Sequence, residues 1–256
     1  MRLLRPLVTL LGLLLAWQAL VWATGVPPFI LPGPGRVGVA LAGHAGLILH
    51  HASITLSEIL LGIVLGSLFG ASTAVTLAAS RTAQRWLMPL LVVSQALPVF
   101  ALAPLLVLWL GYGMLSKVAM AVLIIYFPVT TAFLDGLRRT EPGWVELARI
   151  MDASGPAMLA QIRIPAALPA LTSGLRVAAA VAPIGAVIGE WVGSSAGLGY
   201  LMLQANARMQ VDLMFAALLV LAGMALLLWL AVDRAARALV PWQPETAAHA
   251  DPQGDH

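Results

Sequence analysis

The chain has 256 residues, of which 61% are hydrophobic and only 10% are charged, and it contains no cysteine. Soluble domains usually carry about 45–50% apolar and about 25% charged residues, so this composition excludes a water-soluble globular protein and indicates an all-α integral membrane protein. The net charge of +3 comes from scattered basic residues, which suit the flanks of membrane helices and argue against nucleic-acid binding.

Six apolar segments follow one another along the chain, and each is long enough to cross a bilayer core of roughly 30 Å as a helix. We predict them at 6–24, 52–79, 87–110, 114–136, 166–190 and 213–233. Residues 1–50 would hold the first helix and a Pro- and Gly-rich external loop, and residues 51–240 would form the core. The polar segment 241–256 is typical of a disordered tail. No clear cleavage site follows the first segment, which favours a retained helix over a signal peptide.

The basic residues predict the orientation of these segments. If the crossings alternate and the N-terminus is cytoplasmic, three basic residues fall outside: Arg36, Lys117 and Arg208. The inside set is larger and comprises Arg2, Arg5, Arg81, Arg85, Arg138, Arg139, Arg149, Arg163, Arg234 and Arg237. The excess of positive charge on cytoplasmic loops therefore predicts that both termini lie in the cytoplasm.

The loop at 138–165 is predicted to be a cytoplasmic helix–turn–helix on the inner membrane surface. Its charged residues would each cost about 2.5 kcal/mol near mid-bilayer, which argues against a seventh crossing. Helical spacing places an apolar side opposite a charged one: Val145, Ala148, Ile150 and Met151 against Glu146, Arg149 and Asp152. Ser154 or Gly155 can cap a second short helix that begins near Pro156, and Pro165 would open the fifth membrane helix. An ordinary interfacial loop is the alternative.

This loop resembles a known motif. The stretch ELARIMDASGPAMLAQIRIPAALPAL is similar to the EAA loop of permease subunits of bacterial ABC importers, in which Glu146 and Ala148 match the EAA positions and Ile162 and Pro165 match the ending. Ile164 stands where Leu is usual, and Asp152 stands where the motif has glycine. Asp tolerates left-handed backbone better than most residues, so the turn can persist. PLLVVSQALPVFALAPLLVLWLGYG and IGEWVGSSAGLGYLM further resemble the nitrate/sulfonate/taurine branch.

The resemblance implies a type I importer permease of about six transmembrane helices in the bacterial inner membrane. The EAA helix would dock on a cytoplasmic ATPase subunit through Glu146, Leu147, Ala148, Arg149, Asp152, Ala153, Ser154 and Gly155. The implied partners are two ATPase subunits, which bind ATP and Mg, an external substrate-binding protein and a second copy of this chain. The sequence has no G-x-x-x-x-G-K-[ST] phosphate loop, so the chain is not expected to be an enzyme. The transported solute would be a thiamine pyrimidine precursor such as hydroxymethylpyrimidine, with sulfonate, taurine or nitrate as alternatives.

The fifth segment holds the candidates for the translocation path: Pro183, Gly185, Gly189 and Glu190. Pro183 removes a backbone donor and the glycines allow close helix approach, which packing alone would also explain. Glu190 is an acid near a membrane interior, and the alternative to a path role is local capping or pairing at the interface. The stretch GSSAGLGY after it resembles a nucleotide loop only superficially and is expected to be a flexible external loop.

Several further residues carry weaker signals. His44, His50 and His51 are expected to lie in a loop and to bind no metal. Glu58 and Arg176 are expected near helix ends, where the Arg176 side chain can snorkel to the membrane surface. Pro98 and Pro104 are expected to bend the third segment. An ion-coupled secondary transporter would carry ionisable residues deep in its helices, and a membrane-embedded enzyme would need clustered catalytic groups. Neither feature is evident in the sequence.

Overall fold

The computed structural model describes residues 4–242, with side chains described from Val8 onward. Arg2, the side chain of Arg5 and residues 243–256 of the predicted tail lie outside that part. Within residues 4–242 the elements are helical throughout: α1 (Leu4–Thr24), α2 (Pro34–Gly43), α3 (Ala45–Ala79), α4 (Arg81–Ala96), α5 (Val99–Leu110), α6 (Met114–Arg138), α7 (Pro142–Ile150), α8 (Gly155–Met158), the π-helix η1 (Leu159–Arg163), α9 (Ile164–Gly193), α10 (Leu198–Ala207) and α11 (Val211–Leu239).

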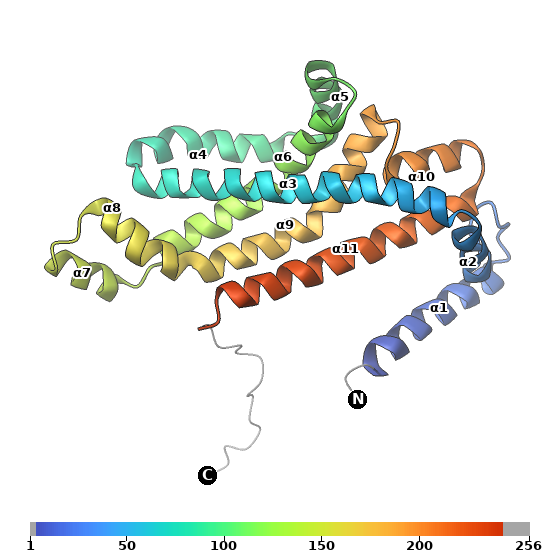
Figure 1. Ribbon diagram of the computed structural model, residues 1–256, viewed down its shortest axis with the longest axis horizontal. Coiled ribbons are helices and arrows are strands. Elements are labelled where there is room, and N and C mark those ends of the chain that lie inside the picture. Colours follow the sequence, from blue (N-terminus) through green and yellow to red (C-terminus); the bar gives the residue numbers. More distant parts are fainter. Residues whose placement is uncertain (1–3, 243–256) are drawn as a thin grey trace, which may run out of the picture.

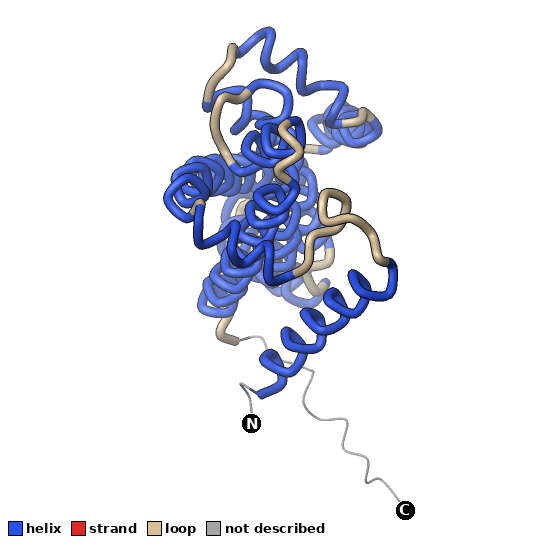
Figure 2. The backbone as a smooth tube through the Cα atoms, turned by 90° about the vertical axis from the view of Figure 1, so that its right-hand side faces the viewer, coloured by secondary structure: helices blue, strands red, loops and turns tan. Residues whose placement is uncertain are grey.

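The core of the molecule is formed by α3, α6 and α9, which run side by side (Figures 1 and 2). Glycines face the contacts and let the backbones approach closely. A Cβ atom on Gly66 of α3 would lie 2.8 Å from Ile125 of α6, and one on Gly185 of α9 would lie 2.8 Å from the Ala121 backbone of α6. Ala178, Ala182 and other small residues of α9 complete this core. Helix α1 stands apart from the bundle and packs through Trp17 on Phe215 of α11, with ring centroids 6.0 Å apart.

The six predicted segments all fall on helices. By length and composition four described helices can each cross a membrane: α3, α6, the continuous helical stretch Gly155–Gly193 and α11. The described apolar part of α1, Val8–Thr24, is shorter. Helix α3 begins at Ala45 rather than at 52, so the expected loop position of His50 and His51 is wrong: both lie in α3, and His44 is its N-cap residue.

The third predicted segment is not one straight helix. Helices α4 and α5 meet at an angle of 102° across a break at Leu97 and Pro98. Proline lacks an N–H and disfavours helical geometry in the residue before it, and Leu97 accordingly has φ −76° and ψ 127°. Pro104 lies inside α5 without ending it. The break, rather than a gentle bend, makes α4–α5 either a broken span or a re-entrant element.

The two ends of the bundle differ. Helices α7 and α8 lie at one end, whereas α2 and α10 lie at the other (Figure 1). Near the α7 end, Arg176 of α9 pairs with Asp233 of α11 at 2.7 Å, and Arg237 also contacts Asp233. Arg176 is therefore paired within the chain, which corrects the expectation that it snorkels. At the α2 end, Arg36 pairs with Asp212 of α11 at 2.9 Å.

Candidate functional site

The predicted helix–turn–helix forms, with a different division of its faces. Val145 and Ala148 of α7 are buried and pack with Met158 of α8, partly covered by Ala153 and Ile162. The expectation that Ile150 and Met151 share this face is wrong, because both are exposed. Ala148 was expected to let a partner approach, but it lies against this chain's own residues. Its small side chain permits the close contact between α7 and the following helix.

An apolar surface on α7 is left without a partner. Trp144, Leu147, Ile150 and Met151 are exposed, with 82% of Ile150 accessible. Three of them, Trp144, Leu147 and Met151, also line a groove of about 560 Å³ that extends to Pro165 at the start of α9. Glu146, Arg149 and Asp152 are exposed beside this surface. An apolar patch with a polar rim at the end of a bundle is typical of a protein interaction site. We refer to Trp144, Leu147, Ile150 and Met151 as the α7 surface.

The turn after α7 has the left-handed backbone for which the EAA motif normally uses glycine. Asp152 has φ +60°, in the left-handed region. Its amide donates to the Arg149 carbonyl at 3.0 Å, and the Ala153 amide donates to the Ala148 carbonyl at 2.9 Å. These two bonds are the pair that defines a Schellman motif, which normally has glycine at the left-handed position. Ser154 then caps α8 by accepting from the Ala157 amide, as predicted, while Gly155 is the first residue of α8. However, α8 is not a separate short helix, because it continues through η1 into α9.

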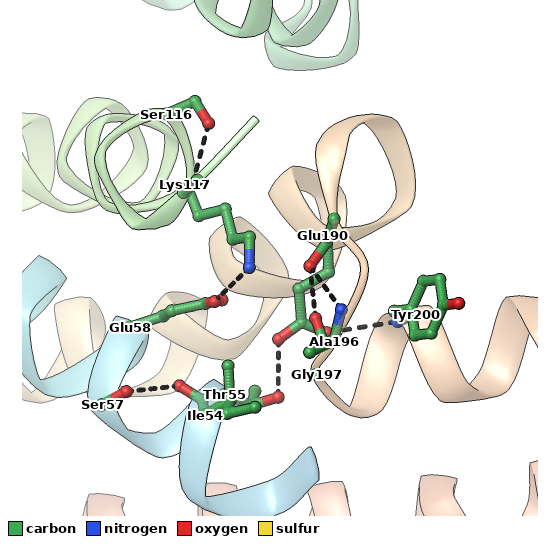
Figure 3. A network of polar contacts seen from close by, with 12 residues as sticks. Ile54, Thr55, Ser57, Glu58, Ser116, Lys117, Glu190, Ala196, Gly197 and Tyr200 are labelled. Carbon is green, nitrogen blue, oxygen red and sulfur yellow. Dashed lines mark hydrogen bonds and ion pairs between the residues drawn. The ribbon is translucent and has the colours of Figure 1, made fainter. Parts of the chain in front are cut away.

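A second polar site is buried near the opposite end, where α9 meets α10 (Figure 3). The Glu190 carboxylate accepts hydrogen bonds from the amides of Gly199 at 2.5 Å and Tyr200 at 3.3 Å, in the first turn of α10. Its other oxygen accepts from the Thr55 hydroxyl of α3 at 2.6 Å. The first amides of a helix lack intrahelical partners and favour a negative charge. Glu190 therefore caps α10, which agrees with the alternative of local capping.

Helix α3 supplies the remaining partners of this turn. The Leu198 amide donates to the Thr55 hydroxyl oxygen at 2.7 Å, and the Gly197 amide donates to Nδ1 of His51 at 3.0 Å. Because His51 accepts at Nδ1, a neutral ring carries its proton on Nε2. The stretch 193–200 is therefore not simply the expected flexible loop: it begins at the last residue of α9, is hydrogen-bonded to α3 and α9, and continues as α10 from Leu198.

Two ionisable residues are buried between the helices, contrary to what the sequence suggested. Glu58 of α3 is completely buried and pairs with Lys117 of α6 at 2.8 Å. Because α3 begins at Ala45, Glu58 lies well inside α3 rather than near its end, whereas its partner Lys117 lies in the first turn of α6. One Glu58 oxygen, Oε2, is buried without a hydrogen-bond partner among the described residues. Glu58 and Lys117 were not singled out as site residues, although a glutamate and a lysine inside apolar segments were a usable signal.

The glycines of α9 and α10 fit around these groups. A Cβ on Gly189 would lie 3.1 Å from the Lys117 backbone, and one on Gly199 would lie 2.8 Å from a Glu190 oxygen. Gly197 has φ +113° and also faces the Glu190 carboxylate. Pro183 and Gly185 are buried in the same helix. Contacts within the chain account for these residues, and their place in a translocation path stays a prediction. In residues 4–242 no group of three His, Asp or Glu side chains could hold a metal ion.

Residues 51–243 match the family model of the binding-protein-dependent transport system inner membrane component. A probable ABC transporter permease protein of Haemophilus influenzae is 56% identical, over 91% of this chain and 95% of that protein. The riboflavin transport system permease protein RibX of Chloroflexus aurantiacus is 39% identical, covering 92% and 89% of the two chains. The formylaminopyrimidine transport permease protein ThiX of Halalkalibacterium halodurans is 33% identical, covering 94% and 96%.

Among solved structures, the MetNI methionine ABC transporter in an inward-facing conformation contains a similar chain, with a TM-score of 0.68 and 19% sequence identity. The similarity covers 77% of this chain and 98% of that one, and it shows a shared fold. The family match spans both the bundle and the helical hairpin at 138–165. The chain therefore belongs to the family of inner-membrane components of binding-protein-dependent transport systems, as a permease subunit of an ABC importer.

Proposed function

We propose that this chain, as a pair of identical copies, moves a thiamine pyrimidine precursor from an external binding protein into the cytoplasm, driven by two ATPase subunits that bind ATP and Mg. The observation that carries the coupling role is the exposed α7 surface beside Glu146 and Arg149. Four large apolar side chains facing water would be costly without a partner, and the charged residues beside them would keep the helix out of lipid. Both termini would lie in the cytoplasm, with α7.

Leu147, Glu146 and Arg149 would contact the ATPase directly, whereas Asp152, Ala153, Ser154 and Gly155 would hold the turn. Ala148 would act from inside the hairpin by keeping α7 close to η1. ATP-driven closure of the ATPase pair would then move α7 together with α9, because a short hydrogen-bonded turn joins α7 to α8, and α8 continues through η1 into α9.

The coupling role is tested by purifying the tagged chain from its own membranes in mild detergent and quantifying the ATPase subunit that accompanies it. Leu147→Glu combined with Ile150→Glu should abolish copurification, because both charges would fall in the apolar contact. Leu239→Glu is the matched control, since Leu239 is an exposed leucine at the end of α11 and outside the hairpin. Equal recovery of ATPase with all three chains would refute docking at α7.

The pyrimidine assignment is supported by the relative ThiX, whose name gives formylaminopyrimidine as its solute and which matches nearly the whole chain. RibX supports riboflavin as a second candidate, since it has the higher identity. Uptake by proteoliposomes that contain the permease, the ATPase and the binding protein would decide between them. Saturable, ATP-dependent uptake of hydroxymethylpyrimidine that excess riboflavin does not inhibit is the expected result. Preference for riboflavin, taurine or another sulfonate would overturn the assignment.

A further inference from the structure

The break between α4 and α5 lies at the depth of the middle of the bundle. Ser94, three residues before Leu97, is hydrogen-bonded to the phenol of Tyr126. Tyr126 is the central residue of α6, which runs from Met114 to Arg138 and is long and apolar enough to cross a membrane. In Figure 1, α4 runs along α3 and α5 turns away from that direction. The non-helical backbone at Leu97 therefore lies near the level of the middle of α6, and a membrane-spanning α6 would place it far from either membrane surface.

Backbone polar groups are left free at this break. The Leu97 amide makes no hydrogen bond to any described residue, whereas the corresponding amide after α3, at Ser80, donates to the Thr76 carbonyl at 3.2 Å. The last carbonyls of α4 lack intrahelical donors, as at every helix end, and receive no hydrogen bond from elsewhere in residues 4–242. Pro98, the N-cap of α5, gives no side-chain cap to the first amides of α5.

The polar side chain next to the break is free as well. Gln95 is exposed, and its amide makes no hydrogen bond within the part of the chain that the structure describes. Leu97, at the break itself, is 47% exposed. Free backbone groups and an unpartnered amide cannot face lipid at this depth, because hydrocarbon offers no hydrogen bonds. Such groups occur at membrane depth only where protein covers them or where they line a water-filled cavity.

We propose that the α4–α5 break opens onto the aqueous translocation pathway and that Gln95 is a polar contact for the transported solute there. The inference rests on the proposed transport function. It places the pathway on the third apolar segment, on a face separate from the packed glycines of α9. Discontinuous helices whose ends face a solute are a common way to build such sites in transporters.

The chemistry of the break favours a neutral solute with both donors and acceptors. Between Arg85 and Lys117 the chain carries no charged residue. The end of α4 presents carbonyl acceptors, the start of α5 presents amide donors, and the Gln95 amide offers both. An aminopyrimidine has a matching edge, with a ring nitrogen that accepts beside an amino group that donates, and a carboxamide can bind such an edge through two hydrogen bonds. Residues 86–116 themselves offer a sulfonate no cation.

The absence of cysteine makes a direct test possible, because a single introduced cysteine can be probed in the otherwise unchanged chain. We compare Gln95→Cys with Leu90→Cys, which lies on the same helix and is 63% exposed. A small, charged, membrane-impermeant methanethiosulfonate is added to intact cells, to right-side-out vesicles and to inside-out vesicles. It reacts with thiolate, which forms in water and not in lipid.

With the reagent on at least one side of the membrane, Gln95→Cys should be labelled at least roughly tenfold faster than Leu90→Cys, because only the cysteine at position 95 would be hydrated. Reaction no faster than that of Leu90→Cys from both sides would overturn the inference. Efficient oxidative cross-linking of Gln95→Cys between two copies, without labelling, would also overturn it by showing that the partner copy covers the break. This readout needs neither a known solute nor a bound ATPase, so it can succeed or fail independently of the proposed function.

The solute contact is tested by uptake of hydroxymethylpyrimidine with Gln95→Leu, Gln95→Asn and, as a matched control, Leu90→Val. Gln95→Leu should lower uptake roughly fivefold to tenfold, since one or two hydrogen bonds are lost, and Gln95→Asn should retain more. Full uptake by Gln95→Leu would refute the contact. If the unmodified chain takes up no pyrimidine while Gln95→Cys is labelled, the substrate assignment fails and the pathway assignment stands.

Discussion

At the scale of single residues, two acidic residues lie at backbone positions with special requirements. Asp152 occupies a left-handed position that glycine fills more easily, and Glu190 satisfies amides at the start of α10. The sequence identified both positions, the first by its departure from a glycine motif and the second as an acid near the membrane interior. It could not show that Glu190 turns inward to α10, because that depends on Thr55 and α3, far away in the chain.

Asp152→Gly should preserve copurification of the ATPase and slightly stabilise the hairpin, since glycine reaches positive φ without steric cost. Asp152→Val should weaken copurification strongly, because a β-branched residue is a genuine outlier at positive φ. Quantitative mass spectrometry of the purified complex measures both. Equal ATPase recovery from the valine and glycine variants would show that the turn geometry is unimportant.

Glu190→Ala should destabilise the chain by about 3 kcal/mol, because two amides and the Thr55 hydroxyl lose their acceptor and buried unsatisfied groups cost about 1–3 kcal/mol each. Glu190→Gln keeps one acceptor oxygen and should lose less. Thermal unfolding in detergent, followed by loss of monodisperse protein, ranks the variants. Glu146→Ala, at an exposed position, is the control expected to unfold with the parent chain. An unchanged midpoint for Glu190→Ala would refute the capping role.

At the scale of elements, the lengths of the apolar segments predicted the helices well, but they did not predict three features. Helix α3 begins at Ala45 and includes the polar residues His50 and His51, which were expected in a loop. The third segment breaks at Pro98, whereas Pro104 and Pro183 are tolerated within helices, and a proline alone does not distinguish these outcomes. The pairing of α3 with α6 through Glu58 and Lys117 is a long-range contact that no local pattern encodes.

That pair gives a prediction for the contact between α3 and α6. Lys117→Met should destabilise the chain by about 3–5 kcal/mol, because the buried Glu58 carboxylate loses the cation with which it pairs and a buried charge without a partner is costly. The double variant Glu58→Gln with Lys117→Met should recover much of the loss, since neither side chain is then charged. Thermal unfolding of the two variants side by side measures the coupling. If the double variant is as unstable as the single one, the ion pair is not the cause.

At the scale of the whole molecule, the resemblance of the loop and of further stretches predicted the family, and composition predicted the membrane. Neither predicted buried ionisable groups, which are the feature expected of an ion-coupled carrier. In the structure these groups are engaged: Lys117 pairs with Glu58, and Glu190 caps α10. The arrangement favours a structural role for them, and energy supplied by a partner ATPase.

In proteoliposomes supplied with ATP, uptake should therefore persist when a protonophore collapses the proton gradient. It should vanish when the ATPase carries a substitution that blocks hydrolysis. Solute accumulation measured under both conditions separates an ATP-driven importer from an ion-coupled carrier. Uptake that survives the ATPase substitution and disappears with the protonophore would reverse the assignment.

The unbroken helical stretch Gly155–Gly193 has a mechanical consequence. Its 39 residues span about 58 Å at about 1.5 Å per residue, so it acts as a stiff rod that reaches from the α7 hairpin to Glu190. A tilt imposed at one end must appear at the other, and α10 is fastened there by the Glu190 carboxylate. The π-turn at Leu159–Arg163 is the one wider coil in this rod, and it is placed beside the hairpin. If the ATPase moves the hairpin as proposed, this continuous helix would carry that movement to α10 at the opposite end of the bundle.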